Sequence, residues 1–257
     1  MKHVIKKDYL LLALVLLAIL GSCGRNKLKA TLTADERMRI AEKMYENGDY
    51  LDAKTEFKII TLNFPGSTVS DRAQFYLGEC HYKLKEYILS SAEYRKLTRI
   101  FPNSEFVDDA QYKIALSNFK LSPKYSLDQT NTQKAIEEFQ RFLEDYPNSD
   151  LVPEANKYML KCREKLARKN YENAESYRKR AFFTAAIKYY DHVLDNFYDT
   201  KYAEKALFGK AEAFRKSGDL DQAIKYYQVF LEKYPDSSKI SRVKNLLAKM
   251  QTGEQEG

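Results

Sequence analysis

Residues 218–237 read GDLDQAIKYYQVFLEKYPDS, and this stretch decides the fold. Ala223, Tyr227 and Phe230 are separated by four and then three residues, so they share one face of a helix, which Pro235 then ends. The same order of small, aromatic and apolar residues, closed by a proline or tyrosine, occurs five times. The sets are Ala53, Phe57, Ile60, Pro65; Ser90, Tyr94, Leu97, Pro102; Ala135, Phe139, Phe142, Pro147; Ala186, Tyr190, Val193, Tyr198; and Ala223, Tyr227, Phe230, Pro235. The sequence therefore predicts an all-α solenoid of five helical hairpins.

The distances between repeats predict where the solenoid departs from regularity. The small residues are 37, 45, 51 and 37 residues apart. The third repeat gains an insertion, SPKYSLDQTNT at residues 122–132, before a second helix that starts near Gln133. The fourth is longer because residues 153–180 contain no glycine or internal proline and predict one long basic helix. We expect repeats 1–3 at residues 34–150, repeats 4–5 with a C-terminal capping helix at 151–250, and a disordered tail at 251–257.

The first 22 residues have the features of an export signal. Three lysines precede an apolar run at residues 9–20, which is too short to span a bilayer comfortably. The run ends in Leu20-Gly21-Ser22-Cys23, which resembles the lipobox of bacterial lipoproteins, in which the cysteine is acylated and becomes the mature N-terminus. An ordinary cleaved signal with an incidental cysteine is the alternative. We predict a signal peptide at 1–22, a lipid such as palmitate on Cys23, and a tether at 23–33 that ends in a helix-capping Thr33.

Composition and charge argue against several classes of function. The net charge of +7 falls to +5 without residues 1–22, and no base-reading motif accompanies it, so we expect no nucleic-acid partner. His81 and His192 are isolated, and no glycine-rich phosphate loop is present, so we predict no catalysis, no metal site and no cofactor apart from the lipid on Cys23. Cys80 and Cys162 lie in different repeats, which favours two separate buried thiols over a disulfide.

The helical hairpin with fixed small residues and a closing proline resembles the tetratricopeptide repeat, TPR. The insertion SPKYSLDQT and the following KAIEEFQRFLEDYP, together with the signal, Cys23 and five repeats, resemble the BamD family. Its members are lipoprotein subunits of the outer-membrane β-barrel assembly machinery. The resemblance implies a lipid-anchored scaffold on the periplasmic side of the outer membrane. Its implied partners are unfolded β-barrel proteins, bound by the N-terminal repeats, and a BamA-like barrel-forming subunit, docked by the C-terminal repeats.

Two alternatives to this resemblance stay open. One is another periplasmic TPR lipoprotein adaptor, for envelope constriction or for a secretion system. The other is an accessory domain of a cell-wall enzyme, which is disfavoured because repeats occupy the whole chain after the tether.

The first helices of the first three repeats suggest a peptide-binding groove. Residues seven apart on a helix lie on the same side, and in these helices they are mostly aromatic. The predicted groove consists of Met38, Tyr45, Phe75, Tyr82, Tyr112 and Phe119. The alternative is that these rings pack between neighbouring hairpins, as aromatic stripes at helical spacing commonly do.

The long basic helix suggests a docking surface for an acidic partner domain or for anionic headgroups. The predicted docking residues are Lys169, Arg178, Lys179 and Arg180. The alternative is a solvated helix face without a partner.

Overall fold

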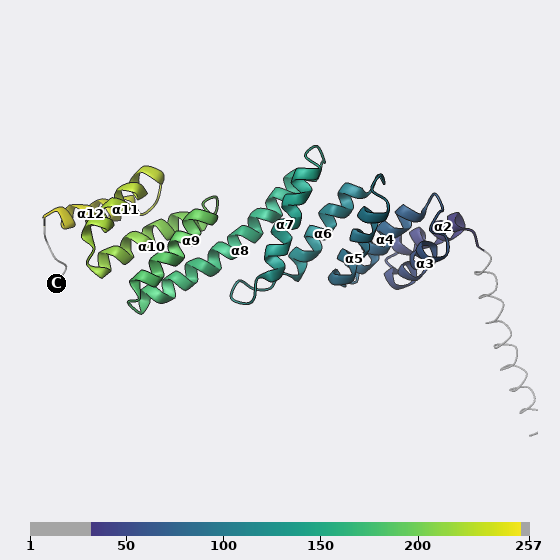
Figure 1. Cartoon of the computed structure of the whole chain (residues 1–257), viewed down its shortest axis with the longest axis horizontal. Coiled ribbons are helices and arrows are strands. Elements are labelled where there is room, and N and C mark those ends of the chain that lie inside the picture. The colour runs from purple at the N-terminus through teal and green to yellow at the C-terminus, as the bar shows by residue number, and fades with distance from the viewer. Residues whose placement is uncertain (1–31, 253–257) are drawn as a thin grey trace, which may run out of the picture. The chain divides into compact units, whose positions relative to one another are not determined.

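The computed structural model describes residues 32–252, so Cys23, the predicted signal and most of the tether lie outside the described residues. The described part contains eleven helices and no strand, which confirms the all-α prediction (Figure 1). In order they are α2 (Ala34–Glu46), α3 (Tyr50–Asn63), α4 (Ser70–Lys83), α5 (Tyr87–Ile100), α6 (Val107–Leu121), α7 (Thr130–Asp145), α8 (Val152–Lys179), α9 (Phe183–Asn196), α10 (Lys201–Ser217), α11 (Leu220–Lys233) and α12 (Ile240–Thr252).

The helices form two compact units, one that ends at Val107 and one that begins at Asp108. The division falls between the second and third repeats, and the predicted grouping of repeats 1–3 and repeats 4–5 stays a prediction. In the first unit, α2 pairs with α3, α3 with α4 and α4 with α5. In the second unit, α7 packs on α8, the helices from α8 to α11 pack successively, and α12 packs on α11. Each unit is therefore built from neighbouring helices.

The residues that define the repeat form the core of each hairpin. The small, aromatic and apolar residues of all five sets are 0% exposed. In the first unit, Phe57 and Ile60 pack with Leu77 and Cys80. In the second, Tyr227 and Phe230 pack with Leu207 and with Val243 of α12. The pattern read from residues 218–237 is thus confirmed as the core pattern, and α12 covers the last hairpin as predicted.

The ends of the helices follow from local hydrogen bonds. Thr33 and Glu36 form the predicted capping box at the start of α2, with the Thr33 side chain accepting a hydrogen bond from the Glu36 amide. The predicted start of α7 near Gln133 is corrected to Thr130. Local hydrogen bonds order the end of the insertion: the Asp128 carboxylate accepts one of 3.0 Å from the Thr130 amide, and the side chain of Gln129, the residue before the helix, accepts one of 2.7 Å from the Thr132 hydroxyl.

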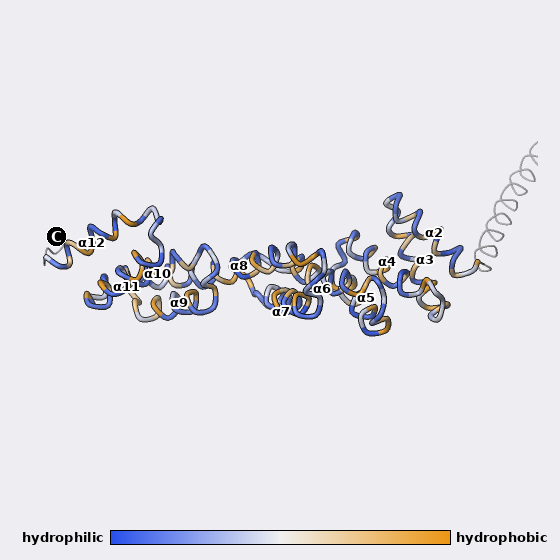
Figure 2. The backbone as a smooth tube through the Cα atoms, turned by 90° about the horizontal axis from the view of Figure 1, so that it is seen from above, coloured by the Kyte–Doolittle hydropathy of each residue, from blue (hydrophilic) through white to orange (hydrophobic). Residues whose placement is uncertain are grey.

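Hydrophobic and hydrophilic residues alternate along the helices of both units (Figure 2). This alternation is what amphipathic helices need to bury one face and expose the other. Within residues 32–252, no helix has both the length and the apolar character required to cross a membrane.

Candidate functional site

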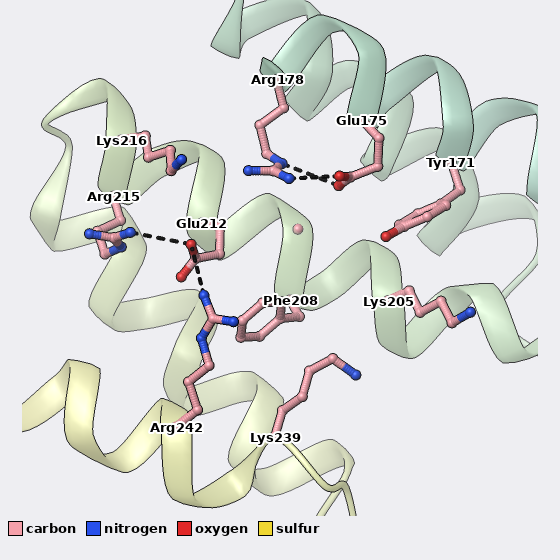
Figure 3. A pocket seen from close by; sticks show the side chains of 11 residues that line it. Tyr171, Glu175, Arg178, Lys205, Phe208, Glu212, Arg215, Lys216, Lys239 and Arg242 are labelled. Carbon is pink, nitrogen blue, oxygen red and sulfur yellow. Dashed lines mark hydrogen bonds and ion pairs between the residues drawn. The ribbon is translucent and has the colours of Figure 1, made fainter. Parts of the chain in front are cut away.

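A cavity of about 410 Å³ lies in the second unit, between α8, α10 and the start of α12 (Figure 3). Most of its lining residues carry charge. They are Tyr171, Glu175 and Arg178 on α8; Lys205, Phe208, Gly209, Glu212, Arg215 and Lys216 on α10; and Lys239 and Arg242. Six of these side chains are cationic and two are anionic, so the cavity has a net positive charge.

Each carboxylate that lines this cavity accepts a hydrogen bond from a buried tyrosine. The Tyr190 hydroxyl donates to Glu175, and the Tyr227 hydroxyl donates to Glu212. Burial works against ionisation of Glu212, but the hydrogen bond from Tyr227 and the contact with Arg215 outweigh it and lower the pKa of this carboxyl. Burial likewise opposes ionisation of Glu175, but its hydrogen bonds from Arg178 and Tyr190 lower the pKa of that carboxyl, so both carboxylates remain charged at neutral pH.

Each of these carboxylates in turn positions an arginine. Arg178 donates two hydrogen bonds to Glu175, the shorter of 2.6 Å, and these bonds raise the pKa of the guanidinium. Arg215 and Arg242 lie 3.3 and 3.6 Å from Glu212. A guanidinium presents several N–H donors in a fixed plane, which suits carboxylate and phosphate groups. The arrangement can bind an anion, whereas it brings together no nucleophile and base.

A second cavity, of about 610 Å³, lies between α8 and the insertion of the third repeat. Arg168 lies over the Tyr125 ring at 4.0 Å, and Lys165 donates a 2.5 Å hydrogen bond to the Ser122 hydroxyl. Lys169 donates a 2.8 Å hydrogen bond to the carbonyl of Leu127. These contacts fix the insertion against the basic helix.

The predicted docking residues therefore occupy different environments. Lys169 is held by the insertion, and Arg178 is half-buried and paired with Glu175. Lys179 and Arg180 are exposed, and Arg180 lies over the rings of Tyr177 and Phe182 at 5.3 and 5.9 Å. Only Arg178 lines the first cavity. Docking by these four residues stays a prediction, with the exposed pair at the C-terminal end of α8 available to a partner.

The predicted groove residues of the first unit lie mostly in packed positions. Met38 is 2% exposed, and Phe75 is 9% exposed and stacks on Phe106. Tyr45 is half-buried and its hydroxyl donates a 3.1 Å hydrogen bond to Glu79. Tyr82 is half-buried and lies edge-on to Tyr87.

The two groove residues of the second unit behave similarly. Tyr112 is 4% exposed and packs on Phe139 and Phe142. Phe119 is half-buried against Tyr158. Met38, Phe75 and Tyr112 thus pack between helices, which was the alternative to lining a peptide-binding groove. Peptide binding by the partly exposed edges of Tyr45, Tyr82 and Phe119 stays a prediction.

Sequence reasoning missed most of the first cavity. Lys205, Lys216, Lys239 and Arg242 were not singled out, because they come from two helices whose proximity only the fold reveals. One signal was available in the sequence. Each repeat tyrosine that is buried here has a glutamate fifteen residues earlier, as in Glu212 and Tyr227. Glu175 and Glu212 line the cavity, but Glu79, which pairs with Tyr94 in the same way, lies in the first unit and does not line it, so the spacing indicates the buried pairs and not the cavity.

Within residues 32–252, the cysteines and histidines are not grouped with one another into a site. Cys80 and Cys162 are free and buried, and burial raises the pKa of each thiol to about 12. His81 lies 2.6 Å from Glu86, and His192 is exposed. In this range no group of three or more His, Cys, Asp or Glu side chains is arranged to hold a metal ion.

Comparison with known structures finds TPR proteins of low similarity. The TPR2AB domain of yeast Sti1, in a complex with pHSP90, is 13% identical over 85% of this chain and 98% of its own, with a TM-score of 0.40. TTC0263, a TPR protein of Thermus thermophilus, is 14% identical over 86% and 100%, with a TM-score of 0.36. MamA from Desulfovibrio magneticus RS-1 is 14% identical over 79% and 97%, also with a TM-score of 0.36. These scores are low, so the fold assignment rests on the helical hairpins themselves.

Comparison with protein families is more specific. No curated protein sequence matches the chain. Residues 32–229, however, match the family YfiO, described as an outer membrane lipoprotein. This range includes the first four repeat patterns, Ala223 and Tyr227 of the fifth, and all the residues that line the first cavity except Lys239 and Arg242. The chain therefore belongs to the YfiO family of outer membrane lipoproteins, which is the BamD family.

Proposed function

We propose that this chain is the lipid-anchored scaffold of an outer-membrane β-barrel assembly complex. It binds unfolded outer-membrane proteins and docks the barrel-forming subunit. A lipid on Cys23 holds it to the outer membrane, with the repeats facing the periplasm. The observation that carries the proposal is the family match over residues 32–229.

The structure supports this proposal through the kind of surface that it offers. Stacked helical hairpins provide extended surfaces for protein partners. In the second unit, Arg178, Lys205 and Lys216 belong to one cationic cavity, and Lys179 and Arg180 are exposed close to Arg178 along α8. Such a surface is suited to an acidic partner domain. The alternative is another TPR lipoprotein adaptor, and the same surface would serve it equally, so the partner must be identified.

Co-purification separates the two functions. The chain, tagged at its C-terminus, is extracted from outer membranes in a non-ionic detergent and its partners are identified by mass spectrometry. The proposal expects a large β-barrel protein with periplasmic domains in near-stoichiometric amount. Recovery of divisome or secretion proteins without such a barrel would refute it and support the alternative adaptor.

Membrane attachment is tested separately by metabolic labelling with a fatty acid. The wild-type chain is expected to incorporate the label, and Cys23→Ser is expected to abolish it, because the lipid is attached through the cysteine sulfur. Label that persists in Cys23→Ser would contradict the lipobox assignment.

A further inference from the structure

We propose that the cavity between α8, α10 and α12 is a carboxylate-binding site that takes one extended acidic segment of a protein partner. The inference deepens the proposed function, on which it rests only for the identity of that partner. It assigns a ligand class to a site for which the sequence pointed to Arg178 alone.

The size and shape of the cavity suit a few side chains of a peptide. Its volume of about 410 Å³ lies in the range of small-ligand sites. Phe208 and Tyr171 supply apolar surface for the backbone and the methylene groups of such a segment. Lys239 and Arg242 lie over the Phe208 ring at 5.8 and 5.1 Å, so positive charge borders this apolar surface.

The cations of the cavity are held in place before any ligand arrives. Glu175 orients Arg178, and Glu212 orients Arg215 and Arg242, while the tyrosines behind them fix both carboxylates. Lys239 is held 3.1 Å from Glu204. A site whose donors are already oriented loses less conformational entropy when it binds. The buried Tyr–Glu–Arg arrangement is therefore consistent with a binding site as well as with a stable core.

The positively charged groups of the cavity that are not ion-paired with a carboxylate attract the ligand. Lys205 and Lys216 are exposed on α10, and neither forms an ion pair with another described residue. Lys205 lies over the Tyr202 ring at 5.2 Å, and it interacts electrostatically with Glu204 without forming an ion pair. A carboxylate that enters would gain these two ammonium groups and the outward donors of the arginines.

The same wall favours a carboxylate over a phosphate. Glu175 and Glu212 both line the cavity, so an entering anion meets two fixed negative charges as well as the cations. A phosphate carries close to two charges at neutral pH, and its desolvation cost grows with the square of that charge, whereas its attraction to the net positive lining grows only in proportion to it. An Asp or Glu side chain in an extended peptide is thus the favoured occupant.

The test measures peptide binding to the full-length chain, purified in non-ionic detergent. The probe is a fluorescein-labelled hexapeptide with three glutamates alternating with glycine, and binding is followed by fluorescence anisotropy. The matched peptide carries glutamine in place of glutamate, and a third carries phosphoserine at the central acidic position. We expect the glutamate peptide to bind at least about tenfold more tightly than the glutamine peptide, and more tightly than the phosphoserine peptide.

The variant Lys205→Glu with Lys216→Glu tests the location of the site. Both lysines are exposed, so the fold should persist, which circular dichroism checks. The control Lys225→Glu with Lys244→Glu makes the same change of charge at exposed positions that do not line the cavity. We expect the first variant to weaken binding of the glutamate peptide at least about tenfold and the control less than about threefold, since long-range charge effects are screened by salt.

Three outcomes would overturn the inference: equal binding of glutamate and glutamine peptides, tighter binding of the phosphoserine peptide, or equal losses in the variant and its control. Co-purification of the barrel protein is measured in parallel with the wild-type chain. If the barrel protein is recovered but the glutamate peptide does not bind, the inference fails while the proposed scaffold function stands.

Discussion

At the scale of single residues, three buried tyrosines share one partner arrangement. Each donates its hydroxyl to a glutamate fifteen positions earlier on the preceding helix. The pairs are Tyr94 with Glu79, Tyr190 with Glu175, and Tyr227 with Glu212. Repeats one and three have Phe57 and Phe139 at this position, which need no polar partner. A buried hydroxyl and a buried carboxylate are costly alone, and in these three repeats the pairing satisfies both groups.

Replacing Tyr227 with Phe should destabilise the second unit by about 1 to 2 kcal/mol at pH 7, because Glu212 loses a buried donor. The pKa of Glu212 in the folded chain lies below its ordinary value of 4.5, so the stabilisation is present above that pH and is lost as pH falls through the folded pKa. The difference between wild type and variant should therefore shrink as the pH falls below 4.5 and through the folded pKa of Glu212. Denaturant titrations at pH 7 and at pH 3.5 measure both effects.

The matched control for this prediction is Tyr198→Phe, in which the hydroxyl belongs to a side chain that is 65% exposed. Its effect should stay within about 0.5 kcal/mol. A Tyr227→Phe protein as stable as this control would mean that the Tyr227–Glu212 bond contributes nothing to folding.

Gly78 shows why one position of a first helix must be glycine. A Cβ atom added there would lie 2.6 Å from the Tyr94 ring. Tyr94 is 0% exposed, so its ring cannot move aside without disturbing the core. The close approach of ring and helix backbone is thus a packing requirement and not a consequence of chain flexibility.

Gly78→Ala should therefore destabilise the first unit by about 1 to 3 kcal/mol, although alanine is the better helix former. Gly66→Ala, where nothing lies within 4 Å of an added Cβ, serves as the control and should change stability by less than about 0.5 kcal/mol. Thermal unfolding measures both. A Gly78→Ala protein with an unchanged or raised midpoint would show that the ring adapts.

At the scale of elements, the turns between repeats are fastened by serines. In the turns concerned, a serine follows the proline that ends the hairpin. Its hydroxyl donates a hydrogen bond to an acidic residue at the start of the first helix of that same hairpin. The pairs are Ser104 with Asp71 at 2.7 Å, Ser149 with Asp108 at 2.8 Å, and Ser237 with Glu204 at 2.7 Å. The same hydroxyls accept from an amide two residues later. Each serine therefore ties the start of a hairpin to its end, a contact that the sequence alone did not indicate.

Helix α12 is the element that closes the second unit, and Val243 is its single fully buried side chain. Val243→Asp should destabilise the unit by about 2 to 4 kcal/mol, because a charge would replace an apolar contact with Leu207 and Phe230. Urea denaturation followed by circular dichroism measures the loss. Lys244→Asp, at the exposed neighbouring position, is the control. Equal stability of the two variants would show that α12 does not cap the hairpin.

At the scale of the whole molecule, the sequence predicted more of the fold than of the site. The helices were predictable because apolar residues such as Ala223, Tyr227 and Phe230 recur at helical spacing. That spacing places them on one face, which is buried. The predicted groove at Phe75 and Tyr112 shows the limit of this reasoning. Periodicity identifies an apolar face, but it does not reveal whether a neighbouring helix covers that face.

The cavity was unpredictable for a related reason. Tyr171 and Arg242 are far apart in sequence, and they line one space only because α8, α10 and α12 pack together. The boundary between the two units at residues 107 and 108 depends likewise on three-dimensional packing, since the repeat pattern continues across it. Lipid attachment at Cys23 and substrate binding stay predictions.

The central claim is that this chain serves the assembly of β-barrel proteins in the outer membrane. The most direct measurement is the amount of folded barrel protein in outer membranes after conditional depletion of the chain, read from the heat-modifiable mobility of barrels on electrophoresis. The account predicts that folded barrels fall as the chain is depleted, that unfolded forms accumulate, and that a plasmid-borne wild-type copy restores assembly. Normal levels of folded barrels after complete depletion would contradict it.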